Sequence, residues 1–140
     1  MGSKYFKDQK LAMEVFVETF RRLPQDPEAE KALDDLMMLA GFNYTQDGPD
    51  LYFYVDTRGG AYEVAQGKPE DKPDVEMINS LDIAHQAWSN KLNPMMAMAT
   101  GKLKAKGSTS KLLKLAPLLK GISKIYNQVL EEKGLGEIKL

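Results

Sequence analysis

The sequence has no cysteine and only one histidine, His85. Without cysteine the chain can form no disulfide, offers no thiolate nucleophile and cannot ligate a metal through sulfur. A single histidine with no serine–acid pattern beside it is a poor basis for a metal site or a catalytic triad. We therefore interpret His85 as a surface or core-edge residue. A cysteine-free chain suits a reducing compartment, and we expect a cytoplasmic location.

Long apolar runs are also lacking. No stretch approaches the ~20 apolar residues of a membrane-spanning helix, and the first residues do not resemble a signal peptide. The final tripeptide, Ile138-Lys139-Leu140, is close to a peroxisomal address but has isoleucine where a small residue is needed, so we interpret the likeness as chance. Phosphate-binding glycine loops, nucleophile elbows and zinc-binding HExxH motifs are missing. We expect no catalytic residue, no metal and no cofactor, and hence no enzyme.

What is present is an ordinary globular composition of 140 residues, 43% apolar and 28% charged, with a net charge of −1. This length fits one domain, 1–140, with one substantial core. A charge so close to zero produces no field that would attract nucleic acid, and we expect no nucleic-acid partner. At most, we expect transient contact with a membrane surface.

The spacing of apolar residues changes twice along the chain. It is helical at the N-terminus, alternates in the middle third and is mainly helical again afterwards. The predicted order is two helices, four strands, two short helices, one strand and further helix. The expected elements are helices at 8–23 and 26–35, strands around 42–44, 51–56, 62–64 and 75–78, helices at 80–88 and 95–100, a strand at 102–106, and helix from 112 to about 133.

One part of this order carries a distinctive run of residues. A strand leads into a helix that begins near a Ser-x-Asp; a Lys-x-Asn-Pro turn, a short helix and a Gly-Lys-Leu-Lys strand follow. The segments are Asp74–Asp82, Trp88, Lys91-Leu92-Asn93-Pro94 and Gly101–Gly107, preceded by turns at Asp47-Gly48-Pro49 and Arg58-Gly59-Gly60. Over roughly residues 36–116 this pattern resembles the sterol carrier protein 2 family.

The resemblance implies an α+β fold in which one five-stranded, mostly antiparallel sheet is covered by helices around an apolar tunnel. It also implies non-catalytic binding or transfer of a sterol, fatty acid, fatty acyl-CoA or phospholipid. Burial of alkyl surface would drive binding at roughly 25 cal/mol per Å². The residues expected to contact the lipid are apolar, and they are Phe53, Val55, Met77, Ala84, Trp88, Met95, Met96, Met98, Leu103, Leu112, Leu113 and Leu118.

Three structural expectations follow from the residues. Leu51, Phe53 and Val55 should share the helix-covered face of the sheet, beside Leu103 and Ala105 of the last strand. The helix at 95–100 is apolar nearly all round and should be buried on more than one side. Successive residues of that helix turn by about 100°, which puts Met95 and Met98 near one face and Met96 on another.

The C-terminal segment leaves alternatives open. Helix is expected past Pro117, with an apolar stripe that could form a lid on the cavity or the contact surface of a homodimer. If it filled the tunnel, the chain would be an interaction module without a ligand. A second alternative is an accessory domain that presents a lipid-like substrate to a partner enzyme.

Two residue clusters also have ordinary explanations. The methionines of the 95–98 helix suit an adaptable apolar cavity, but methionine is equally common in plain cores. The lysines from Lys102 to Lys114 could contact acyl-CoA phosphates or anionic lipid, or they could simply form a solvated face.

Overall fold

The structure is a computed structural model that describes residues 3–44 and 51–140. Three of its helices begin where the sequence supplies a capping side chain. Asp8, Ser80 and Asn93 each accept a hydrogen bond from backbone N–H groups in the first turn of the helix that follows. These acceptors satisfy N–H groups that a helix leaves without an internal partner. Local sequence therefore explains where these three helices start.

The elements follow the predicted order, with boundaries shifted by a few residues and short 3-10 turns added between them. The predicted turn at Asp47-Gly48-Pro49 lies outside the described residues. The elements are α1 (Gln9–Arg22), η1 (Leu23–Gln25), α2 (Pro27–Asp34), β1 (Leu39–Asn43), β2 (Tyr52–Asp56), η2 (Arg58–Gly60), β3 (Glu63–Gln66), β4 (Val75–Ile78), α3 (Leu81–Trp88), α4 (Pro94–Ala99), β5 (Lys104–Gly107), α5 (Thr109–Leu113), η3 (Ala116–Leu118), α6 (Leu119–Glu132) and η4 (Gly136–Ile138).

The five strands form one sheet in the order β3-β2-β1-β4-β5. Strand β1 pairs with β4 in parallel, whereas the other three pairings are antiparallel. The predicted α+β class with a mostly antiparallel five-stranded sheet is thus confirmed. The predicted position of β2 beside the last strand is wrong, because β1 and β4 lie between β2 and β5. Strands β1 and β4 are joined through β2 and β3, so their pairing had no local signature in the sequence.

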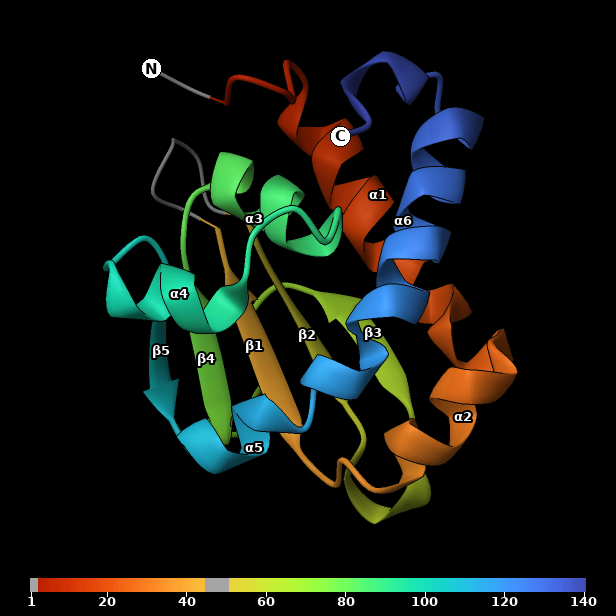
Figure 1. Cartoon of the computed structure of the whole chain (residues 1–140). Helices are drawn as coiled ribbons and strands as arrows, with labels where there is room; N and C mark the ends of the chain where they lie inside the picture. Colours follow the sequence, from red (N-terminus) through yellow and green to blue (C-terminus); the bar gives the residue numbers. More distant parts are fainter. Residues whose placement is uncertain (1–2, 45–50) are drawn as a thin grey trace.

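The main helices lie on the same side of the sheet (Figure 1). As expected, Leu51, Phe53 and Val55 are buried, at 3%, 0% and 6% exposure. Two phenylalanines of α1, Phe16 and Phe20, contact Phe53, with ring centroids 6.1 and 5.6 Å apart. The core therefore sits between α1 and the β1–β2 half of the sheet.

The expectation that α4 is buried on more than one side is wrong. Only Ala97 is buried, whereas Met95 and Met96 are 54% and 62% exposed. The helix is just six residues long and lies at the β5 end of the sheet (Figure 1). So short a helix at the margin of the sheet leaves Met95 and Met96 exposed, whereas Met98 is partly buried against the core.

The C-terminal helix α6 is a core element rather than a lid. Its apolar stripe packs against α1 and α3 of the same chain, and Ile122, Val129 and Leu130 are fully buried. A bidentate ion pair between Arg22 of α1 and Glu132 of α6 adds a contact at the surface. The homodimer stays a prediction, but the apolar stripe that suggested it is already buried within the chain.

His85 is fully buried, contrary to the surface or core-edge position expected for it. Its Nε2 lies 2.8 Å from the carbonyl oxygen of Ile138, which can only accept, so Nε2 carries the hydrogen. Its Nδ1 then accepts from the hydroxyl of Tyr126, 2.6 Å away. The imidazole joins α3, α6 and η4. Burial lowers the pKa of His85, while the hydrogen bond to Ile138 and, to a smaller extent, the charge of Asp82 oppose that shift. The neutral ring is therefore the form that the fold favours.

Gly107, the last residue of β5, generates the first prediction. Its φ is +94°, and a Cβ there would overlap the carbonyl oxygen of Asp74 and lie 3.3 Å from the Cα of Val75. Gly67 has a similar φ of +90° but open space around it. We expect Gly107→Ala to lower the free energy of unfolding by more than about 2 kcal/mol and Gly67→Ala by only about 1 kcal/mol, measured by urea denaturation. Equal losses would contradict the predicted clash.

The second prediction concerns pH. The folded state lowers the pKa of His85 below its ordinary value of 6.5, so the unfolded chain binds the extra proton more readily. The neutral imidazole therefore contributes its full stabilisation of the fold above the ordinary pKa of 6.5. As the pH falls from there toward the lower pKa of the folded state, the unfolded chain takes up the proton first, and the free energy of unfolding falls by no more than about 1.4 kcal/mol per pH unit. His85→Gln keeps an N–H donor for Ile138 but does not titrate. Its unfolding free energy should change less than that of the parent between pH 7 and 5, and parallel curves would refute the assignment.

Candidate functional site

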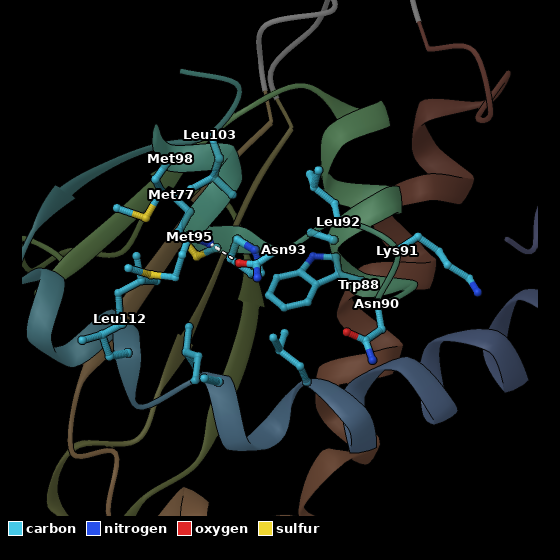
Figure 2. A pocket seen from close by; sticks show the side chains of 16 residues that line it. Met77, Trp88, Asn90, Lys91, Leu92, Asn93, Met95, Met98, Leu103 and Leu112 are labelled. Atoms are coloured by element: carbon cyan, nitrogen blue, oxygen red, sulfur yellow. Dashed lines mark hydrogen bonds between the residues drawn. The ribbon is translucent and has the colours of Figure 1, made fainter. Parts of the chain in front are cut away.

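An open-sided cavity of about 470 Å³ lies over the β4–β5 half of the sheet. Figure 2 shows Met77 of β4, Trp88 and two methionines of α4, Met95 and Met98, around it, with Leu112 of α5 facing them. The lining residues are Met77, Ala87, Trp88, Asn90, Lys91, Leu92, Asn93, Pro94, Met95, Met98, Leu103, Leu112, Leu113, Leu115, Ala116 and Leu119. This volume lies within the range of roughly 300–1,000 Å³ that is typical of small-molecule sites.

The turn between α3 and α4 forms one wall of the cavity. Asn90 ends α3 with a φ of +60°, a conformation that asparagine tolerates better than most residues. Asn93 then caps α4, and Pro94 occupies its first position, where a missing N–H costs nothing. Gly101, at a φ of +79°, ends this segment. The short Lys-x-Asn-Pro segment thus fixes where α4 lies above the sheet.

Trp88 is the rigid part of this wall. Its side chain is 2% exposed, and its indole N–H donates to the hydroxyl of Tyr44 at 2.8 Å. The ring also meets Phe20 and Phe42 edge-on, with centroids 5.2 and 5.8 Å apart. Burial raises the pKa of Tyr44, which keeps its hydroxyl protonated. The indole is therefore held in one orientation beside the cavity.

The chemistry available in the cavity is limited. Lys91 is the only ionisable side chain among the lining residues, and the other polar ones are the amides Asn90 and Asn93. All three belong to the α3–α4 turn, so the polar groups gather in one part of an otherwise apolar lining. In the described part of the chain no group of His, Cys, Asp or Glu side chains could hold a metal ion. The arrangement suits an apolar molecule with one polar end.

The structure brings most of the expected ligand-contact residues to this cavity. They are Met77, Trp88, Met95, Met98, Leu103, Leu112 and Leu113. The predicted separation within α4 also holds, because Met95 and Met98 line the cavity and Met96 does not.

The other expected residues lie elsewhere. Phe53 is fully enclosed among the aromatic side chains beneath α1, and Ala84 is buried in α3 at 1% exposure. Val55 and Leu118 border a separate hollow of about 10 Å³, which is barely large enough for one water molecule. Met96 points to solvent. Alternation and apolar character identified these side chains as inward-facing but could not say which half of the interior has free space.

Ala87 and two groups of lining residues had not been expected. Residues 90–94 of the turn include the Lys-x-Asn-Pro run. The position of this run directly before the methionine-rich helix α4 was the sequence signal that could have identified them as lining residues. Leu115, Ala116 and Leu119 continue from Leu112 with the i, i+3, i+4, i+7 spacing of one helix face. Pro117 conceals that spacing, because a proline normally interrupts a helix, and here it falls within the η3 turn.

Fold and site together define a small α+β domain with an apolar cavity beside a helix-covered sheet. The SCP-2 sterol transfer family model matches residues 17–120. The chain belongs to this family. Among the described residues, no helix is both long and apolar enough to cross a bilayer.

The curated relatives are larger proteins. Human hydroxysteroid dehydrogenase-like protein 2 is 31% identical over 121 residues, which cover 81% of this chain but only 28% of the human protein. The mouse protein of the same name is 32% identical over 103 residues, which cover 73% of this chain and 20% of the mouse protein. The chain thus spans about a quarter of the length of these relatives.

Solved structures share the fold at low sequence identity. The sterol carrier protein domain 2 of Helicoverpa armigera superposes with a TM-score of 0.69 at 21% identity, covering 87% of this chain and 96% of that one. Sterol carrier protein 2 from Aedes aegypti, in complex with the C16 fatty acid palmitate, gives a TM-score of 0.56 at 17% identity, covering 79% and 93%. These two structures support the assignment of the fold.

The hydrogen bond between Trp88 and Tyr44 generates the third prediction. Tyr44→Phe keeps the ring but leaves the buried indole N–H without its acceptor, which typically costs about 1–3 kcal/mol. We expect the free energy of unfolding to fall by that amount and the tryptophan emission of the folded protein to shift, since Trp88 is the only tryptophan. Unchanged stability and emission would show that the bond does not position the indole.

Proposed function

We propose that the chain binds and transfers a long-chain lipid, a fatty acid or its acyl ester, reversibly and without catalysis. The observation that supports this proposal is the cavity of about 470 Å³, apolar except at the α3–α4 turn. An alkyl chain would lie against Met77, Met98 and Leu103, where burying its surface contributes roughly 25 cal/mol per Å². The methionine side chains can adjust to ligands of different shape.

The polar end of the ligand would lie at the α3–α4 turn. The amide of Asn90 and the ammonium of Lys91 are exposed there, so a head group could keep part of its hydration. The Aedes aegypti structure with palmitate supports a fatty acid as the first ligand to test. The family resemblance implies a tunnel. The structure shows a cavity, and the tunnel remains a proposal.

The fourth prediction tests ligand binding with two matched variants of α4. Palmitate should change the fluorescence of Trp88 saturably, because the indole lines the cavity. Met98→Glu should weaken binding at least tenfold, since its carboxylate would be desolvated beside the alkyl chain. Met96→Glu is the control: the same change, on the same helix, at a side chain that is 62% exposed and outside the cavity.

Two results would contradict the proposal. One is a parent protein whose fluorescence does not respond to palmitate. The other is a folded Met98→Glu protein that binds palmitate as well as the Met96→Glu protein does. Far-ultraviolet circular dichroism on both variants establishes that they are folded before their affinities are compared.

A second candidate is favoured by the curated relatives. Because the chain spans about a quarter of hydroxysteroid dehydrogenase-like proteins, it could serve as an accessory domain that presents a lipid-like substrate to an enzyme. A chimera that carries this chain in place of the matching segment of the human relative would test the idea. Met98→Glu should then lower the lipid occupancy and the turnover of the chimera together. Turnover that does not depend on occupancy would favour the independent carrier.

A further inference from the structure

A small apolar hollow lies beside the cavity, one strand away on the same face of the sheet. The cavity is lined by Met77 of β4, and the hollow of about 10 Å³ is lined by Phe42 of β1, which pairs with Met77 in the sheet. Neighbouring strands are about 5 Å apart, so the two spaces are adjacent. Ala40 faces the same side two residues before Phe42, and its single methyl group leaves this hollow above β1.

The side chain of Leu115 separates the two spaces. Among the described residues, Leu115 alone borders both the cavity and the hollow. It is 7% exposed and lies between α5 and η3, in the segment that crosses the covered face of the sheet (Figure 1). Leu115 is therefore the wall between an open-sided cavity and a closed hollow.

The backbone holds this wall in place. The N–H of Leu115 donates to the carbonyl of Leu112 at 3.0 Å, and its carbonyl accepts from the N–H of Leu118 at 2.9 Å. Pro117 has no N–H to continue an α-helix, and the chain forms the 3-10 turn η3 there. Residues three apart lie on the same side of such a turn, which directs Leu115 and Leu118 together toward the hollow. Moving Leu115 aside would break these hydrogen bonds.

The hollow offers only apolar surface. Its two polar lining residues, Thr57 and Tyr62, use their hydroxyl groups within the protein. The hydroxyl oxygen of Thr57 accepts from the N–H of Met38 at 3.0 Å, and the hydroxyl of Tyr62 donates to the carbonyl of Phe20. The other lining residues are apolar. The end of an alkyl chain would suit this space, whereas a polar head group would find no partner in it.

We propose that Leu115 sets the longest alkyl chain that the cavity accepts. This inference rests on the proposed function, because it requires an alkyl chain in the cavity. A chain end that reaches Leu115 can go no further, since the hollow behind it is barely large enough for one water molecule. Longer ligands must leave methylene groups in water. Without the Leu115 side chain, the two spaces would join, and the extra methylene groups would be buried over β1.

The chain-length preference of the parent and two alanine variants tests this role. Affinities for palmitate and the longer arachidate are measured by the fluorescence of Trp88. Leu115→Ala should raise the affinity for arachidate relative to palmitate at least tenfold, because each additional buried methylene strengthens binding about fourfold. Leu118→Ala is the matched control: it makes the same truncation in the hollow but not in the wall, so its affinity ratio should equal that of the parent.

Met38 reports directly on the hollow. It is 1% exposed, and it lines the hollow but not the cavity. In ¹³C-methyl spectra, arachidate should shift the Met38 signal of Leu115→Ala and leave it nearly unchanged in the parent and in Leu118→Ala. A Met38 signal that responds in the parent overturns the wall, and so does one that stays silent in a folded Leu115→Ala protein that binds arachidate.

The remaining outcomes distinguish this proposal from the proposed function. A parent that binds palmitate, with the same affinity ratio as Leu115→Ala, overturns only the role of Leu115. A parent that binds neither acid overturns both. Truncation of a buried leucine destabilises a core, so circular dichroism first establishes that each variant is folded. If Leu115→Ala does not fold, Leu115→Val removes less and should still raise the ratio about threefold; an unchanged ratio in that variant overturns the wall.

Discussion

The packing of aromatic rings between α1 and the sheet is the constraint on which the rest of the structure depends. Phe42 and Phe53, on neighbouring strands, stack with centroids 4.7 Å apart, and Phe20 of α1 lies over both at 5.4 and 5.6 Å. Such large side chains bury much apolar area and tolerate few alternative arrangements. They fix α1 over β1 and β2, and α6 then packs against α1.

This arrangement fills only half of the covered face. Above β4 and β5 stand α4 and α5, of six and five residues, which are too short to place a full apolar face on the sheet. The space that they leave is the cavity, with Met77 of β4 among its lining residues. The helices at the two ends of the chain therefore build the core beside the cavity and do not plug it; from α6, only Leu119 borders it.

Much of this could be predicted from the sequence because the signals were local. Asp8, Ser80 and Asn93 mark helix starts through contacts within one turn, and the spacing of Met95 and Met98 showed that they share a face. The neighbours of β2 were not predictable in this way, because the parallel pairing of β1 and β4 joins segments that are distant in sequence. The alternating pattern also could not distinguish Phe53 from Met77, because both side chains face the interior. Only the packing of α1 decides that Phe53 lies in the filled core and Met77 beside the cavity.

The central claim, that the space above β4 and β5 is the ligand site, is tested most directly by methyl NMR of the methionines. The chain has eight methionines, of which Met77, Met95 and Met98 line the cavity and Met13, Met37 and Met96 lie outside it. Titration of ¹³C-methyl-labelled protein with palmitate should shift the first three signals together, saturably, and leave the other three nearly unchanged. Shifts confined to Met13, Met37 or Met96, or no shift at all, would contradict the account.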